Sequence, residues 1–253
     1  MNEQSIFNLL LIGWLILAAV IFFALFFITA PYGRHTRRGW GASISNRLGW
    51  IIMEAPAPLV FIAMFLIGNT GVSITSALFL AMWLAHYIHR AFIYPFSLRD
   101  SGSRMPLFII ASAILFNAVN GYLNGRYIFA FSGGYSNQWL TDPHFIAGVV
   151  LFIAGFRINR QADNTLRRLR LPEECGYKIA NEGLFRWVSC PNYFGEIMIW
   201  TGWAIATWSL PGLAFAVWTA ANLVPRARVH HVWYLQNFPD YPAKRKALLP
   251  RLW

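Results

Sequence analysis

Long apolar runs recur along this chain of 253 residues, and they constrain its fold more than any other feature. Several of them are long enough to span a bilayer, which takes roughly 20 apolar residues in a helix. Only 12% of the residues are charged, whereas a soluble domain of this length has about a quarter. A surface with so few charges would aggregate in water, so the sequence predicts an all-α, polytopic integral membrane protein.

Seven apolar segments have the length of membrane spans. They cover about 5–29, 48–67, 73–95, 106–129, 143–159, 193–209 and 212–236. The first lacks a basic n-region and is interpreted as a retained span rather than a signal peptide. Pro211 separates the last two, although it could instead kink one long helix. We expect residues 1–253 to form a single membrane domain in which the polar segment 160–192 lies on the cytoplasmic side.

The formal net charge of +11 comes from Lys and Arg residues in the loops between these spans. Cytoplasmic loops collect basic residues in membrane proteins. If the N-terminus is outside, every Lys and Arg except Arg126 lies in or near the cytoplasmic side. This placement predicts an outside N-terminus and a cytoplasmic C-terminus, and it argues against nucleic-acid binding. Cys175 and Cys190 would face a reducing compartment, so no disulfide is expected.

Glu54 is an ionisable residue at membrane depth, where such a group is costly and usually has a partner or a function. It lies about seven residues inside the second predicted span, roughly 10 Å deep. Tyr87 reaches a similar depth in the third predicted span, which runs the other way. A carboxyl group and a phenol together could polarise a ketone oxygen in a lipid substrate. The alternative is a protonated Glu54 that only bonds to a neighbouring helix.

Three groups of polar residues recur at helical spacing near the cytoplasmic ends of the last three spans. They are Asn159, Asp163, Arg167 and Arg170; Asn192 and Glu196; and Arg226, His230 and Tyr234. Arginine suits phosphates, and Asn and Asp suit ribose or amide groups, so the groups predict a cavity for a large anionic ligand. Solvated helix faces are the alternative. A dinucleotide would be held without a Rossmann fold, because no GxGxxG motif follows a strand. His86 and His89 lack further ligands, so no metal site is predicted.

Several motifs resemble those of the steroid 5α-reductase family, and the resemblance covers nearly the whole chain. In the first half they are Trp50-Ile51-Ile52-Met53-Glu54-Ala55-Pro56 and Ala85-His86-Tyr87-Ile88-His89-Arg90-Ala91-Phe92-Ile93-Tyr94-Pro95. In the second half they are Leu166-Arg167-Arg168-Leu169-Arg170, Gly183-Leu184-Phe185, Asn192 with Gly195-Glu196, Ala206-Thr207-Trp208-Ser209-Leu210-Pro211 and Asp240-Tyr241-Pro242. Together these motifs are highly specific.

The resemblance implies a seven-helix fold that binds NADPH near the cytoplasmic side and transfers a hydride to C5 of a 3-oxo-Δ4-steroid. Glu54 and Tyr87 match the carboxylate and tyrosine that hydrogen-bond the 3-keto oxygen, and segment 160–192 would cover the cofactor. The implied cofactor-binding residues are Tyr32, Arg34, Tyr94, Asn159, Asp163, Arg170, Tyr177, Asn192, Glu196, Arg226, His230 and Tyr234, and helical spacing adds Arg167.

The sequence departs from the family pattern at three places. Met53 stands where the animal enzymes of the family have glutamine, which removes one possible contact to the substrate ketone. Lys178 stands where the family often has arginine, so the charge is kept but the bidentate geometry is lost. The stretch 99–106 is one residue longer than the family pattern, so a phosphate contact from Arg104 is a hypothesis.

Two other functions compete with the reductase. Isoprenylcysteine methyltransferase-like enzymes bind S-adenosylmethionine, but they show Arg-His-Pro before Tyr-x-Gly, whereas this chain has Ser189-Cys190-Pro191-Asn192-Tyr193-Phe194-Gly195. A non-catalytic lipid carrier would explain Glu54 but not the arginine-rich polar groups. We expect a steroid or sterol-like substrate taken from the membrane lipid, and no obligate protein partner. The location would be a bacterial inner membrane or the endoplasmic reticulum.

Overall fold

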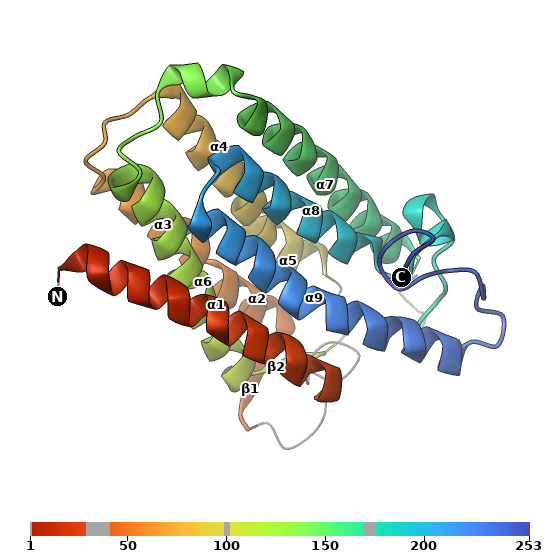
Figure 1. Ribbon diagram of the computed structural model, residues 1–253. Helices are drawn as coiled ribbons and strands as arrows, with labels where there is room; N and C mark the ends of the chain where they lie inside the picture. Colours follow the sequence, from red (N-terminus) through yellow and green to blue (C-terminus); the bar gives the residue numbers. More distant parts are fainter. Residues whose placement is uncertain (1, 29–40, 99–101, 170–175) are drawn as a thin grey trace. The chain divides into compact units, whose positions relative to one another are not determined.

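The computed structural model describes residues 2–28, 41–98, 102–169 and 176–253, and helices dominate this part of the chain (Figure 1). The chain divides into two compact units. Unit 1 comprises Met1–Leu11 and Ala30–Phe145, and unit 2 comprises Ile12–Thr29 and Ile146–Trp253. Helix α1 (Glu3–Phe27) contributes to both units, because the boundary falls within it.

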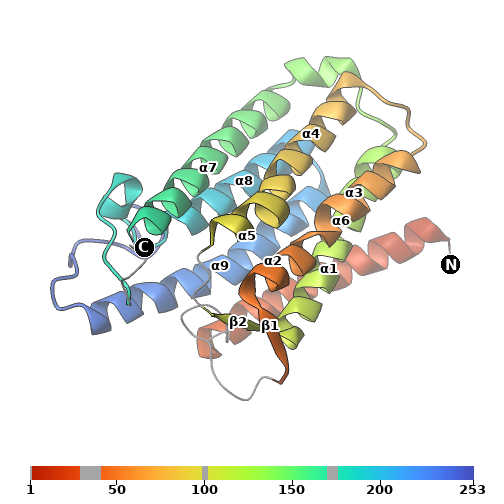
Figure 2. The ribbon, with the colours of Figure 1, turned by 180° about the vertical axis from the view of Figure 1, so that it is seen from behind.

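Unit 1 contains most of the first half of the chain. Its helices are α2 (Asn46–Glu54), α3 (Pro56–Leu66), α4 (Ile74–Ile88), α5 (Tyr94–Ser97) and α6 (Leu107–Arg126). Two π-helical turns, η2 (His89–Ile93) and η3 (Tyr127–Phe131), follow α4 and α6, and the 3₁₀ turn η4 (Asn137–Thr141) comes later. Helices α3 and α6 lie side by side in both ribbon views (Figures 1 and 2).

A small antiparallel ribbon in unit 1 is a feature that the prediction of an all-α fold did not include. Strand β1 (Ser43–Ser45) pairs with β2 (Arg104–Pro106), with Ile44 opposite Met105. Three-residue strands are too short to produce a readable alternation of apolar and polar residues. The ribbon pairs Arg104 with Ser45, which is far from it in the sequence.

Unit 2 contains α7 (Pro143–Arg168) from Ile146 onward, the 3₁₀ turn η5 (Gly183–Arg186), α8 (Pro191–Thr207) and α9 (Leu210–Asn237). Helix α8 ends at Thr207, and the next residue, Trp208, has a left-handed backbone with φ of 43°. The Ser209 side chain then caps α9 by accepting a hydrogen bond from the Gly212 N–H, and Pro211 lies in the first turn. Pro211 therefore stands at the start of a new helix and does not kink one long helix.

Helices α7 and α8 approach each other at glycines spaced seven residues apart on each helix. A Cβ atom on Gly155 would lie 2.6 Å from the Gly195 carbonyl oxygen, and one on Gly195 would lie 2.6 Å from the Asn159 backbone nitrogen. Two further glycines also lie too close to the opposite backbone to carry a Cβ atom: Gly148 faces Ala206, and Gly202 faces Phe152. Small residues let two helix backbones meet this closely. The contact fixes Asn159 of α7 beside the first turns of α8.

Four helical segments of the described residues are long and apolar enough to cross a membrane. They are Glu3–Phe27, Asn46–Leu66, Leu107–Phe131 and Pro143–Arg168. They coincide with four of the seven predicted spans. The predicted spans 73–95, 193–209 and 212–236 also coincide with helices, namely α4 to α5, α8 and α9. The number of spans and the side on which each terminus lies stay predictions.

Arg126, the one basic residue predicted to lie away from the cytoplasmic side, has an acidic partner in unit 1. Its Nε and Nη2 donate to the two carboxylate oxygens of Glu3, each at 2.7 Å. The Arg126 guanidinium also lies 5.1 Å from the centre of the Phe131 ring. A bidentate ion pair of this kind holds the N-terminus of α1 against the end of α6.

Candidate functional site

Glu54 lies at the point where the second predicted span is interrupted. It is the last residue of α2, and α3 begins at Pro56. Pro56 and Pro58 have no N–H and cannot donate the hydrogen bonds that would continue the helix across this point. The Glu54 side chain is only 12% exposed. At this junction a nearly buried carboxyl group therefore lies beside backbone carbonyl groups that Pro56 and Pro58 leave without a helical N–H donor.

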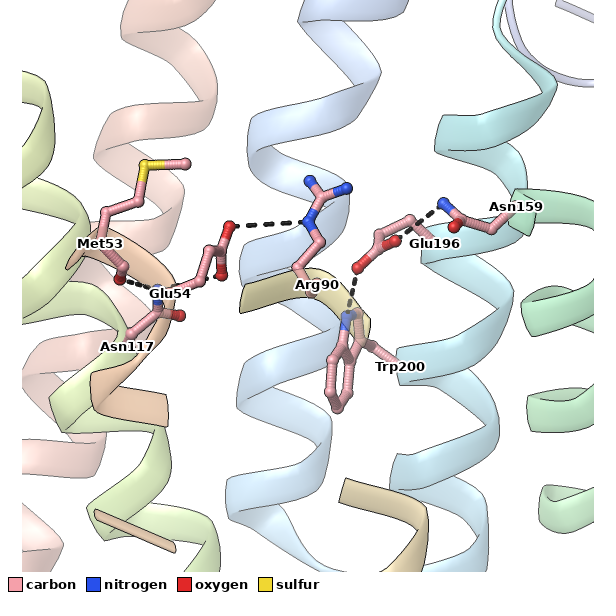
Figure 3. Close-up of polar contacts among 7 residues, drawn as sticks. All are labelled: Met53, Glu54, Arg90, Asn117, Asn159, Glu196 and Trp200. Atoms are coloured by element: carbon pink, nitrogen blue, oxygen red, sulfur yellow. Dashed lines mark hydrogen bonds and ion pairs between the residues drawn. The ribbon is translucent and has the colours of Figure 1, made fainter. Parts of the chain in front are cut away.

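The two oxygens of the Glu54 carboxyl group have different partners (Figure 3). Oε1 lies 3.6 Å from Nε of Arg90. Oε2 accepts a hydrogen bond of 3.3 Å from Nδ2 of Asn117, on α6. The same Asn117 nitrogen donates to the Met53 carbonyl oxygen at 2.6 Å. Donors from two other segments of unit 1 thus fix the orientation of this carboxyl group.

Arg90 reaches Glu54 from the π-helical turn η2. This turn precedes Pro95, and it is closed by the Tyr94 N–H, which donates to the His89 carbonyl. The Arg90 guanidinium lies 4.6 Å from the centre of the Trp50 ring and 5.3 Å from that of Tyr94. Cation–π contacts of this length stabilise a positive charge independently of a carboxylate. Tyr94, predicted to bind the cofactor, here forms part of the aromatic surroundings of Arg90.

Tyr87 is 3% exposed and lies on α4 in the same unit as Glu54. Its ring packs against Trp83 at 5.1 Å and against His86 at 5.0 Å. Trp83 in turn donates from its indole nitrogen to the carbonyl oxygen of Ala57, in the first turn of α3. This aromatic contact connects α4 to the proline-containing junction beside Glu54. A joint action of Tyr87 and Glu54 on one ketone stays a prediction.

The Met53 side chain belongs to an apolar cluster. It is 7% exposed and packs with Met105 and Ile110, against which Trp50 and Ile114 also pack. Only its backbone carbonyl takes part in the Glu54 contacts, through Asn117. The position where animal enzymes of the resembled family have glutamine is therefore used here for apolar packing.

A second polar cluster lies in unit 2, where α7 meets α8 (Figure 3). Nδ2 of Asn159 donates to Oε2 of Glu196 at 2.9 Å and to the Asn192 carbonyl at 3.0 Å. The other oxygen of Glu196 accepts from the indole nitrogen of Trp200 at 3.1 Å. Asn192 donates from its own side chain to Asp163 at 3.3 Å. Four residues predicted from helical spacing are thus brought together by hydrogen bonds.

Arg226 and His230, on α9, meet a tyrosine of α8. Nε of Arg226 donates to the Tyr193 hydroxyl at 2.9 Å, and that hydroxyl lies 3.1 Å from Nε2 of His230. His230 is 6% exposed. Tyr234, one turn further on, stacks on Tyr241 with ring centres 5.1 Å apart. The third predicted polar group therefore faces α8 and the C-terminal segment.

The C-terminal segment is connected to the start of α8 through buried hydroxyl groups. Oγ of Ser189 lies 2.7 Å from the Tyr241 hydroxyl and 2.7 Å from Nδ1 of His231. Burial raises the pKa of the Tyr241 hydroxyl, which keeps it neutral and able to donate. The Arg245 guanidinium donates to the Ala180 carbonyl and to Asn181. These contacts anchor the chain that leads from residue 180 into α8.

The remaining predicted residues have separate surroundings. Arg167 donates to Asn164 on its own helix, and Lys178 is exposed. Tyr177 contacts the Trp233 ring at 5.0 Å. Arg104 hydrogen-bonds Ser43 across the β-ribbon, so its phosphate role stays a hypothesis. Three predicted residues lie outside the described part of the chain: Tyr32, Arg34 and Arg170.

The sequence reasoning did not single out Asn117, Tyr193 or Trp200. Asn117 had a readable signal, because a polar side chain within a long apolar span usually has a partner or a function. Tyr193 and Trp200 had none, since aromatic residues make up 17% of this chain. No group of three His, Cys, Asp or Glu side chains among the described residues is placed to hold a metal ion.

Comparisons with known proteins agree with one another. A sequence profile described as 3-oxo-5-alpha-steroid 4-dehydrogenase matches residues 103–253. Steroid 5-alpha-reductase DET2 of Gossypium hirsutum is 40% identical over an alignment of 253 positions, which covers 98% of this chain and 98% of that protein. 3-oxo-5-alpha-steroid 4-dehydrogenase 1 of Macaca fascicularis is 43% identical over 224 residues, covering 87% of this chain and 84% of that protein. The human protein of the same name is 42% identical over 224 residues.

These relatives cover nearly the whole of this chain and are oxidoreductases, so the chain is an oxidoreductase. It belongs to the 3-oxo-5-alpha-steroid 4-dehydrogenase family. The resemblance read from the motifs around Glu54, Tyr87 and Glu196 is thereby confirmed at the level of the family.

Proposed function

We propose that the chain reduces the Δ4 double bond of 3-oxo-Δ4-steroids, with NADPH as the source of the hydride. The hydride forms the new C5–H bond, and the electron pair of the C4–C5 double bond moves toward C3 and its oxygen. The carbonyl re-forms when C4 takes a proton. Net consumption is one hydride and one proton for each double bond, and the 3-keto group is retained in the product.

The Glu54 carboxyl group carries this proposal. Negative charge develops on the 3-keto oxygen during hydride addition, and a hydrogen-bond donor already oriented toward that oxygen lowers the barrier. Glu54 is almost buried, and its two oxygens have separate partners, which supports a fixed orientation of this carboxyl group. We assign the second donor role to the Tyr87 hydroxyl.

The aromatic rings around Arg90 make its positive charge compatible with a protonated Glu54. A buried cation is costly when its only partner is neutralised. The guanidinium of Arg90, however, also lies over Trp50 and Tyr94, at 4.6 and 5.3 Å from the ring centres. These aromatic faces keep Arg90 stabilised while the Glu54 carboxyl group holds the proton that it shares with the ketone.

The polar cluster of unit 2 fits the polar parts of NADPH. Amide and carboxylate groups, here Asn159, Asn192 and Glu196, are suited to the carboxamide and ribose hydroxyls. Arg226 supplies a cation suited to phosphate, and its contact with Tyr193 fixes its direction. When bound, the cofactor supplies the hydride, and these side chains would orient it and exclude water. We assign the outer contacts to Tyr32, Arg34, Arg167, Arg170 and Lys178.

We further propose that the chain crosses the membrane seven times, with an outside N-terminus and the cofactor site facing the cytoplasm. The four long apolar helices support a membrane location, and the basic loops support this orientation. The steroid would then enter from the bilayer, while the soluble cofactor would enter from the cytoplasm of a bacterium or from the cytoplasmic face of the endoplasmic reticulum.

Purified protein in detergent or nanodiscs is expected to oxidise NADPH only when a 3-oxo-Δ4-steroid such as progesterone is added. The matched control is the same steroid with a C3 hydroxyl group, which offers Glu54 no carbonyl to polarise and is expected to give no oxidation. Absorbance of NADPH and mass spectrometry of the steroid measure the outcome. Tight binding of S-adenosylmethionine without binding of NADPH would overturn the proposal in favour of a methyltransferase.

A further inference from the structure

Helix α6 carries three asparagines that are almost completely buried. Asn117 is 4% exposed, and Asn120 and Asn124 are each 1% exposed. An amide transferred from water to an apolar interior costs a few kcal/mol unless it is hydrogen-bonded. Nδ2 of Asn120 donates to the Phe116 carbonyl, and Nδ2 of Asn124 donates to the Asn120 carbonyl, one turn earlier on the same helix in each case. Asn117 donates to residues of another helix, α2.

Asn117 uses one NH2 group for two acceptors at the junction of α2 and α3. Its nitrogen lies 2.6 Å from the Met53 carbonyl oxygen and 3.3 Å from Oε2 of Glu54. The NH2 group carries two hydrogens, so both contacts can form together. One contact fixes the backbone immediately before Glu54, and the other fixes its carboxyl group. Asn117 therefore contacts both the backbone and the side chain at the end of α2.

The close approach of α6 to α3 explains how the short side chain of Asn117 contacts Met53 and Glu54 at the end of α2. Gly121 lies one helical turn beyond Asn117, and a Cβ on it would lie 3.2 Å from the Ala57 carbonyl oxygen. Gly125, a turn further, would place a Cβ 2.7 Å from Cβ of Met64. These glycines bring the two helices close together, so the short Asn117 side chain meets the end of α2 without strain.

We propose that Asn117 is a positioning residue for Glu54: by holding Oε2, it presents Oε1 to the substrate ketone. The inference rests on the proposed role of Glu54 in polarising that ketone. Oε1 faces Arg90, whose guanidinium also lies over the rings of Trp50 and Tyr94. Without Asn117 the carboxyl group can rotate, and the Met53 carbonyl loses its donor. The ketone then meets the wrong oxygen, or no oxygen, in most of the bound complexes.

Two substitutions at Asn117 test the proposal. Asn117→Leu has a similar volume and no donor, and Asn117→Asp keeps the shape but cannot donate to both acceptors in either protonation state. We expect kcat for progesterone to fall about 10²-fold in both variants, because small misplacement of a catalytic group has an effect of this size. The KM for NADPH is expected to stay at the wild-type value. Asn124→Leu is the control, since it removes an equally buried amide from the same helix.

A second measurement needs no turnover. Hydrogen bonding to the 3-keto group shifts the ultraviolet absorption of the bound enone to longer wavelength, so progesterone bound without cofactor reports its polarisation. We expect the shift in the wild-type protein and in Asn124→Leu, and its loss in both Asn117 variants and in Glu54→Leu. The effects of Asn117→Leu and Glu54→Leu on the shift are expected to be non-additive, because the two residues act as one unit.

The outcomes separate this inference from the proposed function. If the wild-type protein shows neither a shift nor NADPH oxidation, the role of Glu54 fails and the inference fails with it. If the wild-type protein is active and both Asn117 variants keep the shift and the wild-type kcat, only the inference is wrong. An equal loss in Asn124→Leu would also contradict it, because the effect would then belong to the packing of α6 and not to the contact with Glu54.

Discussion

Glu54→Gln is expected to lower kcat about 10²- to 10⁴-fold, the range attributed to a general acid in proton transfer. The amide keeps the size of the side chain, and its oxygen can still accept from Asn117 Nδ2, which lies 3.3 Å from Oε2 in the wild-type protein. The local fold therefore persists. An amide N–H is, however, a much weaker acid than a carboxyl group, so it stabilises the charge developing on the 3-keto oxygen less well.

The measurements are the steady-state kcat for progesterone with saturating NADPH, and NADPH binding by fluorescence. Cofactor affinity is expected to remain at the wild-type level, because Glu54 is proposed to contact the ketone and not the cofactor. Asp240→Asn is the matched control, since it removes a carboxylate from an exposed position. Wild-type kcat in Glu54→Gln would show that this carboxyl group does not act on the ketone.

Glu196→Leu is expected to raise the KM for NADPH about 10²-fold, with a smaller effect on the KM for the steroid. Glu196 accepts hydrogen bonds from Asn159 at 2.9 Å and from Trp200 at 3.1 Å. Leucine leaves both donors without this acceptor, at a cost of about 1–3 kcal/mol each when they are buried. Trp200 is 2% exposed and cannot turn to water for a replacement. The cluster proposed to orient the cofactor therefore loses its geometry.

Steady-state kinetics with each substrate varied in turn distinguishes the two effects. Glu196→Gln is the conservative comparison, because its carbonyl can still accept from Asn159 while its NH2 group faces the indole donor of Trp200. We expect an intermediate KM for NADPH. Asp240→Leu controls for the loss of an exposed carboxylate. An equal rise in both KM values for Glu196→Leu would contradict the assignment of this cluster to the cofactor.

Helix positions could be predicted from the sequence, because a bilayer requires apolar runs of a fixed minimum length. The polar groups on α7, α8 and α9 could be predicted for a related reason. Residues such as Asn159 and Glu196 interrupt an apolar pattern at helical spacing, and the structure joins these two by a hydrogen bond of 2.9 Å. A polar residue within a strongly apolar helix can therefore be identified from the sequence alone.

The partners of Glu54 could not be predicted, because they depend on tertiary structure. Arg90 reaches the carboxyl group from a π-helical turn before Pro95, and a regular helix would direct the side chain elsewhere. Asn117 comes from a helix sixty-three positions further along the chain. Sequence spacing gives the depth of a residue in the membrane but not its rotation toward a neighbour. The direction of the Arg104 side chain could not be predicted either, and in the structure this side chain donates a hydrogen bond to Ser43.

Isotope labelling tests the central claim most directly. With NADPH deuterated at C4 of the nicotinamide, the reduced progesterone is expected to carry one deuterium at C5, a position that does not exchange with water. With unlabelled NADPH in deuterated water, C5 is expected to carry hydrogen and C4 to gain deuterium. NMR spectroscopy of the purified product locates each label. A product with no deuterium at C5 in the first experiment, or one reduced at the C3 carbonyl instead, would contradict the account.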